Sequence, residues 1–149
     1  MGNLRRILMA EDSLNDIMLT RAALEEITLA NVLDVVRDGA EALDYLFCQG
    51  AYANRDTGTP IVMLLDLKMP KVDGMEVLRQ IRARPDFKTL PVVILTSSRE
   101  ESDLVAGYST GTNAYVVKPV DFGDFVAAIR QLGLFWGVTN EVPGTVLGK

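Results

Sequence analysis

The sequence contains no histidine and only one cysteine, Cys48, among its 149 residues. Without histidine, catalysis by Ser-His-Asp or Cys-His groups is excluded, and so is a metal site with histidine ligands. A single cysteine forms no disulfide within the chain, which fits a protein from a reducing compartment. These two absences remove several common classes of enzyme from consideration.

The sequence also lacks an excess of basic residues and a long apolar run. Its 15 Lys and Arg residues stand against 20 Asp and Glu residues, a formal net charge of −5. This balance argues against nucleic acid or an anionic membrane as the main partner, because phosphate groups are bound by clustered cations. The apolar run 7–10 is too short for an export signal and ends at Glu11 and Asp12. No run is long enough to span a bilayer, so we expect a cytoplasmic protein.

What the sequence does contain is an alternation of short apolar runs with amphipathic stretches, in a length typical of one domain. We predict five strands from the apolar and β-branched runs at 6–10, 32–37, 61–66, 91–96 and 114–117. Helical spacing predicts helices at 14–28, 40–47, 74–81, 100–108 and 122–129, with Ser13 and Asp121 as N-caps of the first and last. This alternation is typical of a parallel sheet with helices on both faces.

Charged and hydroxyl-bearing residues stand at the carboxyl ends of four predicted strands. Glu11 and Asp12 follow the first strand, Asp66 ends the third, Thr96 ends the fourth and Lys118 follows the fifth. Sites in such folds form beyond the carboxyl ends of the strands, so we expect these side chains to share one edge. Each feature alone is more often a turn, a β-former or a loop. The four together, in this order on four strands, indicate a functional site.

Three carboxylates brought together repel each other unless a cation joins them. Mg²⁺ suits such a site, because it binds one or two carboxylates and leaves room for phosphate oxygens. Lys118 would add a second positive charge, and Thr96 would donate a hydrogen bond to the same oxygens. Beside these cations Asp66 is a candidate nucleophile that forms an aspartyl phosphate.

These motifs resemble those of CheY-like response-regulator receivers over about residues 5–132. The matching segments are Ala-Glu-Asp-Ser at 10–13, Leu-Asp-Leu-Lys-Met-Pro at 65–70 with Asp-Gly at 73–74, Leu-Thr-Ser at 95–97, and Tyr-Val-Val-Lys-Pro at 115–119. The resemblance implies a flavodoxin-like, doubly wound α/β fold with a five-stranded parallel sheet of order 2-1-3-4-5 and five helices. It also implies a receiver domain over residues 1–133 and a C-terminal extension, 134–149, without an output domain.

The resemblance assigns a metal-binding role to four residues of the site. Asp66 would be the phosphoacceptor and, with Asp12, a direct ligand of Mg²⁺. Glu11 would act on the ion mostly through water, and the backbone carbonyl of Lys68 would be a further ligand.

The resemblance also implies a conformational switch driven by phosphorylation. A sensor histidine kinase would donate the phosphoryl group to Asp66, and Lys118 would contact it. Thr96 would then move toward the phosphate, and Tyr115 would turn into the space that Thr96 leaves. The surface of helix 4, strand 5 and helix 5 would change its partner preference. The protein would thus be a signalling switch with Mg²⁺-dependent self-phosphorylation and dephosphorylation, and not an enzyme.

Two segments exceed the minimal receiver pattern. The long polar connection 49–60 and the tail, with Leu134, Phe135 and Trp136 followed by Asn-Glu-Val-Pro at 140–143, resemble regulators of phytochrome-type sensor kinases. Apolar residues beyond a complete domain tend to mark interfaces, so we expect a homodimer that uses Phe135 and Trp136. The alternative is a tail that folds back onto its own last helix.

Of three other functions, two fit the sequence less well than that of a receiver, and the third stays open. A phosphatase of the haloacid-dehalogenase type needs a second Asp two residues after its nucleophile, where this sequence has Lys68. A flavodoxin needs a phosphate-binding loop where Glu11 and Asp12 stand, and these would repel the flavin phosphate. A receiver fold used as an unphosphorylated protein-binding module remains an alternative.

Overall fold

The computed structural model describes residues 6–26, 32–55, 58–67, 69–96, 114–117 and 122–133. A five-stranded sheet with the order β2-β1-β3-β4-β5 forms its centre, and every neighbouring pair of strands is parallel. The strands are β1 (Ile7–Ala10), β2 (Leu33–Val36), β3 (Val62–Asp66), β4 (Val92–Thr96) and β5 (Ala114–Val117). The sheet order 2-1-3-4-5 expected from the resemblance is therefore confirmed.

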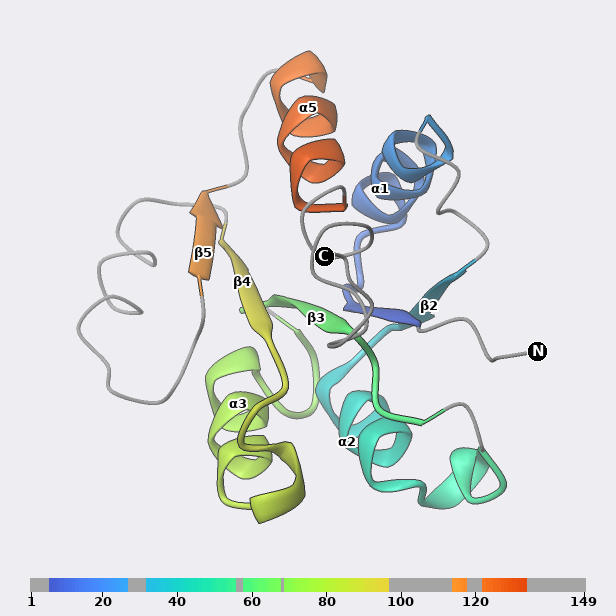
Figure 1. Ribbon diagram of the computed structural model, residues 1–149, viewed down its shortest axis with the longest axis vertical. Helices are drawn as coiled ribbons and strands as arrows, with labels where there is room; N and C mark the ends of the chain where they lie inside the picture. The colour runs from blue at the N-terminus through green and yellow to red at the C-terminus, as the bar shows by residue number, and fades with distance from the viewer. Residues whose placement is uncertain are drawn as a thin grey trace, which may run out of the picture.

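Helices cover both faces of this sheet (Figure 1). In the described residues the helices are α1 (Leu14–Glu25), α2 (Gly39–Phe47), η2 (Gly50–Tyr52), α3 (Gly74–Arg82), η3 (Pro85–Phe87) and α5 (Phe122–Gly133). Helices α2 and α3 lie on one face, and α1 and α5 lie on the other. The helix predicted at 100–108 lies outside the described residues, so the count of five stays a prediction. None of the described helices has both the length and the apolar character needed to cross a bilayer.

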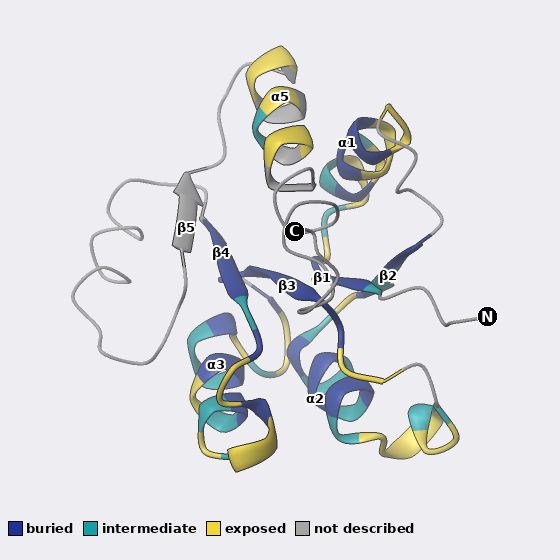
Figure 2. Cartoon of the chain, viewed as in Figure 1, coloured by how far each residue is buried: buried dark blue, intermediate teal, exposed yellow. Residues whose placement is uncertain are grey.

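Both faces of the sheet are buried, because successive side chains along a strand point to opposite faces. The side chains that pack under α2 and α3 are those of Leu8, Ala10, Met63, Leu65, Val92 and Ile94. The alternate positions pack on the other side, and these are Ile7, Met9, Val62, Leu64, Val93 and Leu95. Figure 2 shows the resulting band of buried residues along the central strands. The uninterrupted apolar runs of the sequence are thus explained by burial on two sides.

Polar side chains fix where the helices begin. The predicted N-cap Ser13 is confirmed, since its hydroxyl accepts a hydrogen bond of 3.2 Å from the N–H of Asp16. The predicted N-cap Asp121 lies outside the described residues. Helix α1 ends at Glu25 and not at residue 28 as predicted, because the N–H of Glu26 turns back to the carbonyl of Ala23.

The described part of the long connection 49–60 is packed against α2. The rings of Tyr52 and Tyr45 meet edge to face, with centroids 5.2 Å apart. The hydroxyl of Tyr52 donates to Glu41 at 2.5 Å, and burial together with this bond raises the pKa of Tyr52. The guanidinium of Arg55 lies over the Tyr45 ring and donates to its backbone carbonyl at 2.7 Å. This segment therefore belongs to the folded domain.

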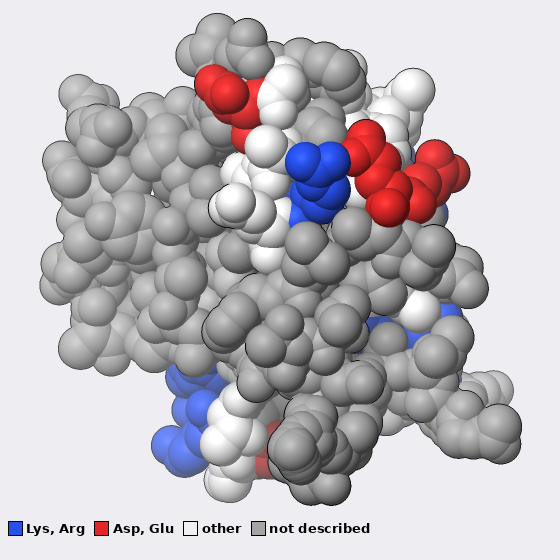
Figure 3. Space-filling model, turned by 45° about the horizontal axis from the view of Figure 1, so that its top comes forward, with Lys and Arg blue, Asp and Glu red and all other residues white. Residues whose placement is uncertain are grey.

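An ion pair at the surface links helix α5 to the end of α1. Arg130 of α5 forms an ion pair with Glu26, the residue that follows α1. Figure 3 shows acidic and basic side chains side by side on this face of the molecule. Because both side chains are exposed, this ion pair accompanies the packing of α5 beside α1 and does not by itself hold the two helices together.

Candidate functional site

Three carboxylates meet at the carboxyl end of the sheet. Glu11 and Asp12 directly follow β1, and Asp66 is the last residue of β3, the strand that pairs with β1. Side-chain oxygens of the three residues all lie within 4.8 Å of one another. Two segments that are distant in the sequence therefore bring their acidic side chains together at one point.

The three carboxylates differ in their exposure to solvent. Glu11 is 1% exposed and Asp66 is 6% exposed, whereas Asp12 lies at the surface. Glu11 accepts a hydrogen bond of 3.1 Å from the N–H of Ser13. Negative charges this close, two of them buried, favour a cation between them. A set of carboxylate oxygens suits hard divalent ions such as Mg²⁺, Mn²⁺ and Ca²⁺.

The chain after Asp66 turns in a confined space before α3 begins. The N–H of Gly74 donates to the carbonyl of Leu67 at 3.0 Å, which closes the turn. A Cβ at Gly74 would lie 2.5 Å from the carbonyl oxygen of Asp66, so a larger residue would displace the turn. Gly74 is therefore required for the close approach of α3 to the acidic site.

The structure places the backbone of two further residues that the sequence assigned to the site. Thr96 is the last residue of β4 and pairs with Val117, the last residue of β5. Tyr115 lies within β5 beside Ile94. Four other residues lie outside the described part of the chain, and these are Lys68, Lys118, Phe135 and Trp136.

Sequence reasoning missed the residues that support the acidic loops from outside. Arg37, just after β2, donates from its guanidinium to the backbone carbonyl of Asp12 at 3.0 Å. Gly39, the first residue of α2, donates its N–H to the carbonyl of Pro70 at 3.3 Å. No sequence signal could have found these contacts, because backbone carbonyls of distant segments accept both bonds.

Two large apolar side chains are exposed just after the acidic pair. Leu14 is 62% exposed and Met18 is 67% exposed, one turn apart on α1. Ile17 and Leu24 of the same helix are buried in the core. Helix α1 therefore presents apolar surface to solvent at the edge of the acidic site.

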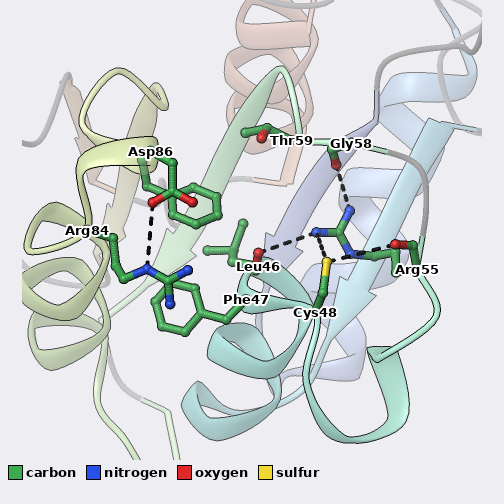
Figure 4. Close-up of a pocket in the computed structure, with 9 residues that line it drawn as sticks. Leu46, Phe47, Cys48, Arg55, Gly58, Thr59, Arg84 and Asp86 are labelled. Atoms are coloured by element: carbon green, nitrogen blue, oxygen red, sulfur yellow. Dashed lines mark hydrogen bonds and ion pairs between the residues drawn. The ribbon is translucent and has the colours of Figure 1, made fainter.

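A separate pocket of about 410 Å³ lies at the carboxyl ends of α2 and α3 (Figure 4). The guanidinium of Arg84 lies 4.2 Å from the ring centre of Phe47 and pairs with Asp86 at 3.6 Å. Arg55 lines the opposite wall and donates to the carbonyl of Gly58 at 2.6 Å. None of the three clustered carboxylates lines this pocket, so it is distinct from the acidic site.

Known proteins resemble this chain over nearly its whole length. The family model of the response regulator receiver domain matches residues 7–130. Response regulator Rcp1 of Synechocystis sp. is 39% identical over 137 residues, which make up 92% of each chain. A crystal structure of the Mn²⁺-bound form of Rcp1 aligns with a TM-score of 0.83 at 38% identity, covering 94% of this chain and 99% of that one.

Two further solved structures are similar in both fold and sequence. The bacteriophytochrome response regulator RtBRR is 56% identical and aligns with a TM-score of 0.77, covering 95% of this chain and 85% of that one. The phosphorylated cyanobacterial phytochrome response regulator RcpA is 36% identical and aligns with a TM-score of 0.83. That alignment covers 94% of this chain and 99% of RcpA.

Proposed function

This chain belongs to the response regulator receiver family, and we propose that it is a phosphorylation switch in which Asp66 accepts a phosphoryl group with the help of Mg²⁺. Receiver domains are signalling switches of two-component systems and not classical enzymes. The observation that carries the proposal is the convergence of Glu11, Asp12 and Asp66 within 4.8 Å at the carboxyl end of the sheet.

The proposed resident ion is Mg²⁺, held by Asp12 and Asp66, by Glu11 through water, and by the backbone carbonyl of Lys68. The donor set supports this choice, since Mg²⁺ and Mn²⁺ both take carboxylate oxygens and the relative Rcp1 has a Mn²⁺-bound form. When bound, the ion would neutralise negative charge on the phosphoryl oxygens during transfer.

The transfer step follows from the position of Asp66. One of its carboxylate oxygens forms a bond to phosphorus, while the bond from phosphorus to the donor nitrogen breaks and that nitrogen keeps the electron pair. Lys118 is proposed to neutralise the phosphoryl oxygens, and Thr96 to donate a hydrogen bond to them. Thr96 and Tyr115 are then the proposed switch, which alters the surface of helix 4, β5 and α5.

The proposed phosphoryl donor is a phytochrome-type sensor histidine kinase in the cytoplasm. RtBRR and RcpA, both named as phytochrome response regulators, support this class of partner. The proposed layout is a receiver over residues 1–133 and an extension, 134–149, that forms a homodimer through Phe135 and Trp136. Self-phosphorylation from small phosphodonors and self-dephosphorylation belong to the same proposal.

Phosphotransfer from candidate sensor kinases to the wild type, Asp66→Asn and Asp86→Asn tests this function. Asp86 is an exposed carboxylate outside the acidic cluster and serves as the matched control. We expect a hydroxylamine-sensitive acyl phosphate on the wild type and on Asp86→Asn only, and only with Mg²⁺ present. A wild type that stays unlabelled, by kinases and by acetyl phosphate alike, would favour the unphosphorylated binding module instead.

A further inference from the structure

Residues 37–41, where β2 leads into α2, contact both loops that carry the acidic residues. On the first side they hold the loop after β1, because the guanidinium of Arg37 donates to the carbonyl of Asp12 at 3.0 Å. The backbone of Arg37 is itself fixed, since its N–H donates to the carboxylate of Glu41 at 2.9 Å. The Asp12 loop is thereby linked to the first turn of α2.

On the second side the same residues hold the loop between β3 and α3. The N–H of Gly39 donates to the carbonyl of Pro70 at 3.3 Å, and the carboxylate of Asp38 pairs with Lys71 at 3.4 Å. The hydrogen bond from the N–H of Glu41 and the charge of Lys71 lower the pKa of Asp38, which keeps it ionised. This loop directly follows Asp66, so its position affects where the Asp66 carboxylate lies in the acidic site.

Close packing limits how far this second loop can shift. A Cβ at Gly39 would lie 1.8 Å from the carbonyl oxygen of Val72 and 2.6 Å from its carbonyl carbon. The obstacle is backbone, so no side-chain rotation would relieve it. Lys71, the residue before Val72, has a φ of 70°, a left-handed conformation that the surrounding contacts must maintain. The start of α2 and residues 70–72 therefore fit together in one arrangement.

We propose that residues 37–41 set the spacing between the two acidic loops and so favour Mg²⁺ over larger ions. Arg37 and Gly39 are positioning residues in this proposal, because they touch the loops and not the ion. Mg²⁺ requires near-octahedral ligands at about 2.0–2.1 Å, whereas Ca²⁺ accepts irregular ligands at about 2.3–2.6 Å. A looser spacing should therefore weaken Mg²⁺ binding more than Ca²⁺ binding. The inference rests on the proposed function, since it requires a divalent ion between these carboxylates.

Calorimetric titration of the purified, metal-free protein with Mg²⁺ and with Ca²⁺ tests the inference. We expect Gly39→Ala and Arg37→Ala each to weaken Mg²⁺ binding relative to Ca²⁺ binding. For Gly39→Ala the expected change is roughly tenfold, the lower end of the losses in metal affinity that follow mutation of residues that orient metal ligands. The ratio of the two Kd values is the decisive quantity. The loss of the Arg37 charge, taken by itself, would strengthen the binding of both ions and leave the ratio of their Kd values nearly unchanged. A changed ratio therefore reports the lost contact with the Asp12 loop and not the lost charge.

The control variant is Ile7→Val, which lowers stability through a buried residue at the amino end of β1, the end of the strand away from the acidic site. Its ratio of Kd values should equal that of the wild type. If Gly39→Ala does not fold, the ratio of Kd values measured for Arg37→Ala alone decides the test. A wild type that binds neither ion contradicts the proposed metal site itself. A wild type that binds both, with variants whose ratio is unchanged, overturns the role of residues 37–41 and leaves the proposed function intact.

Discussion

Asp12 is the exposed member of an otherwise buried group of carboxylates. Glu11 and Asp66 are almost fully removed from solvent, and all three side chains have oxygens within 4.8 Å of one another. Like charges at such distances repel more strongly near a protein interior than in water. The acidic site should therefore lower the stability of the metal-free protein, and the proposed divalent ion should restore it when bound.

Asp12→Asn should raise the free energy of unfolding of the metal-free protein by about 1 kcal/mol, because it removes one of three repelling charges. The same substitution should remove most of the rise in Tm that we expect Mg²⁺ to give to the wild type, since one proposed ligand is lost. Thermal melts in EDTA and in Mg²⁺ measure both effects, with the exposed Glu25→Gln of α1 as the control. An equal rise in Tm with Mg²⁺ in the wild type and in Asp12→Asn would contradict a ligand role for Asp12.

Helix α1 carries apolar residues on two sides, and only one of these sides faces the core. Ile17 and Leu24 are buried, while Leu14 and Met18 are exposed next to the acidic loop. Under the proposed function, a protein that donates a phosphoryl group to Asp66 would have to approach this edge of the sheet. The exposed apolar pair therefore lies where the donor protein would make contact.

Replacing both Leu14 and Met18 by Ala should slow phosphotransfer from the cognate kinase by about tenfold, as for the loss of an apolar contact worth about 1.4 kcal/mol. Phosphorylation by acetyl phosphate should be unchanged, because a small donor needs no protein contact. Rates from both donors are compared with those of Arg21→Ala, an exposed control on the same helix. A similar loss with both donors would indicate damage to the site and not to a docking surface.

At the scale of the whole molecule, the sequence of the extension 134–149 adds apolar residues after α5, the last described helix. Leu134, Phe135 and Trp136 are proposed to contact either a second copy or helix α5. The oligomeric state distinguishes these two arrangements.

We expect the wild type to be a dimer at micromolar concentrations and Phe135→Ala/Trp136→Ala to be a monomer, because loss of two aromatic side chains costs several kcal/mol of interface energy. Sedimentation velocity across a dilution series measures this directly, with Thr145→Ala as a control in the same extension. Trp136 is the single tryptophan, so its fluorescence should change over the same dilution range. A wild type that is monomeric at every concentration would favour the tail that folds back.

Local patterns in the sequence were sufficient to predict most of the fold. Each strand is within one residue of its predicted bounds, because runs such as 62–65 are apolar at every position of a strand buried on both faces. The N-cap Ser13 was recognised because its hydroxyl bonds only three residues ahead. The end of α1 was placed too late, since helical spacing continues past a helix end that backbone hydrogen bonds define.

The sequence by itself determined which residues stand at the ends of the strands, and parallel pairing then brought Glu11, Asp12 and Asp66 together. Only the tertiary structure decided that Leu14 is exposed while Ile17 is buried, and that Gly39 and Arg37 hold the two acidic loops. The physical reason is the distance along the chain over which each kind of interaction acts. Strand and cap signals act over a few neighbouring residues, whereas these contacts join segments that become neighbours only after the sheet has formed.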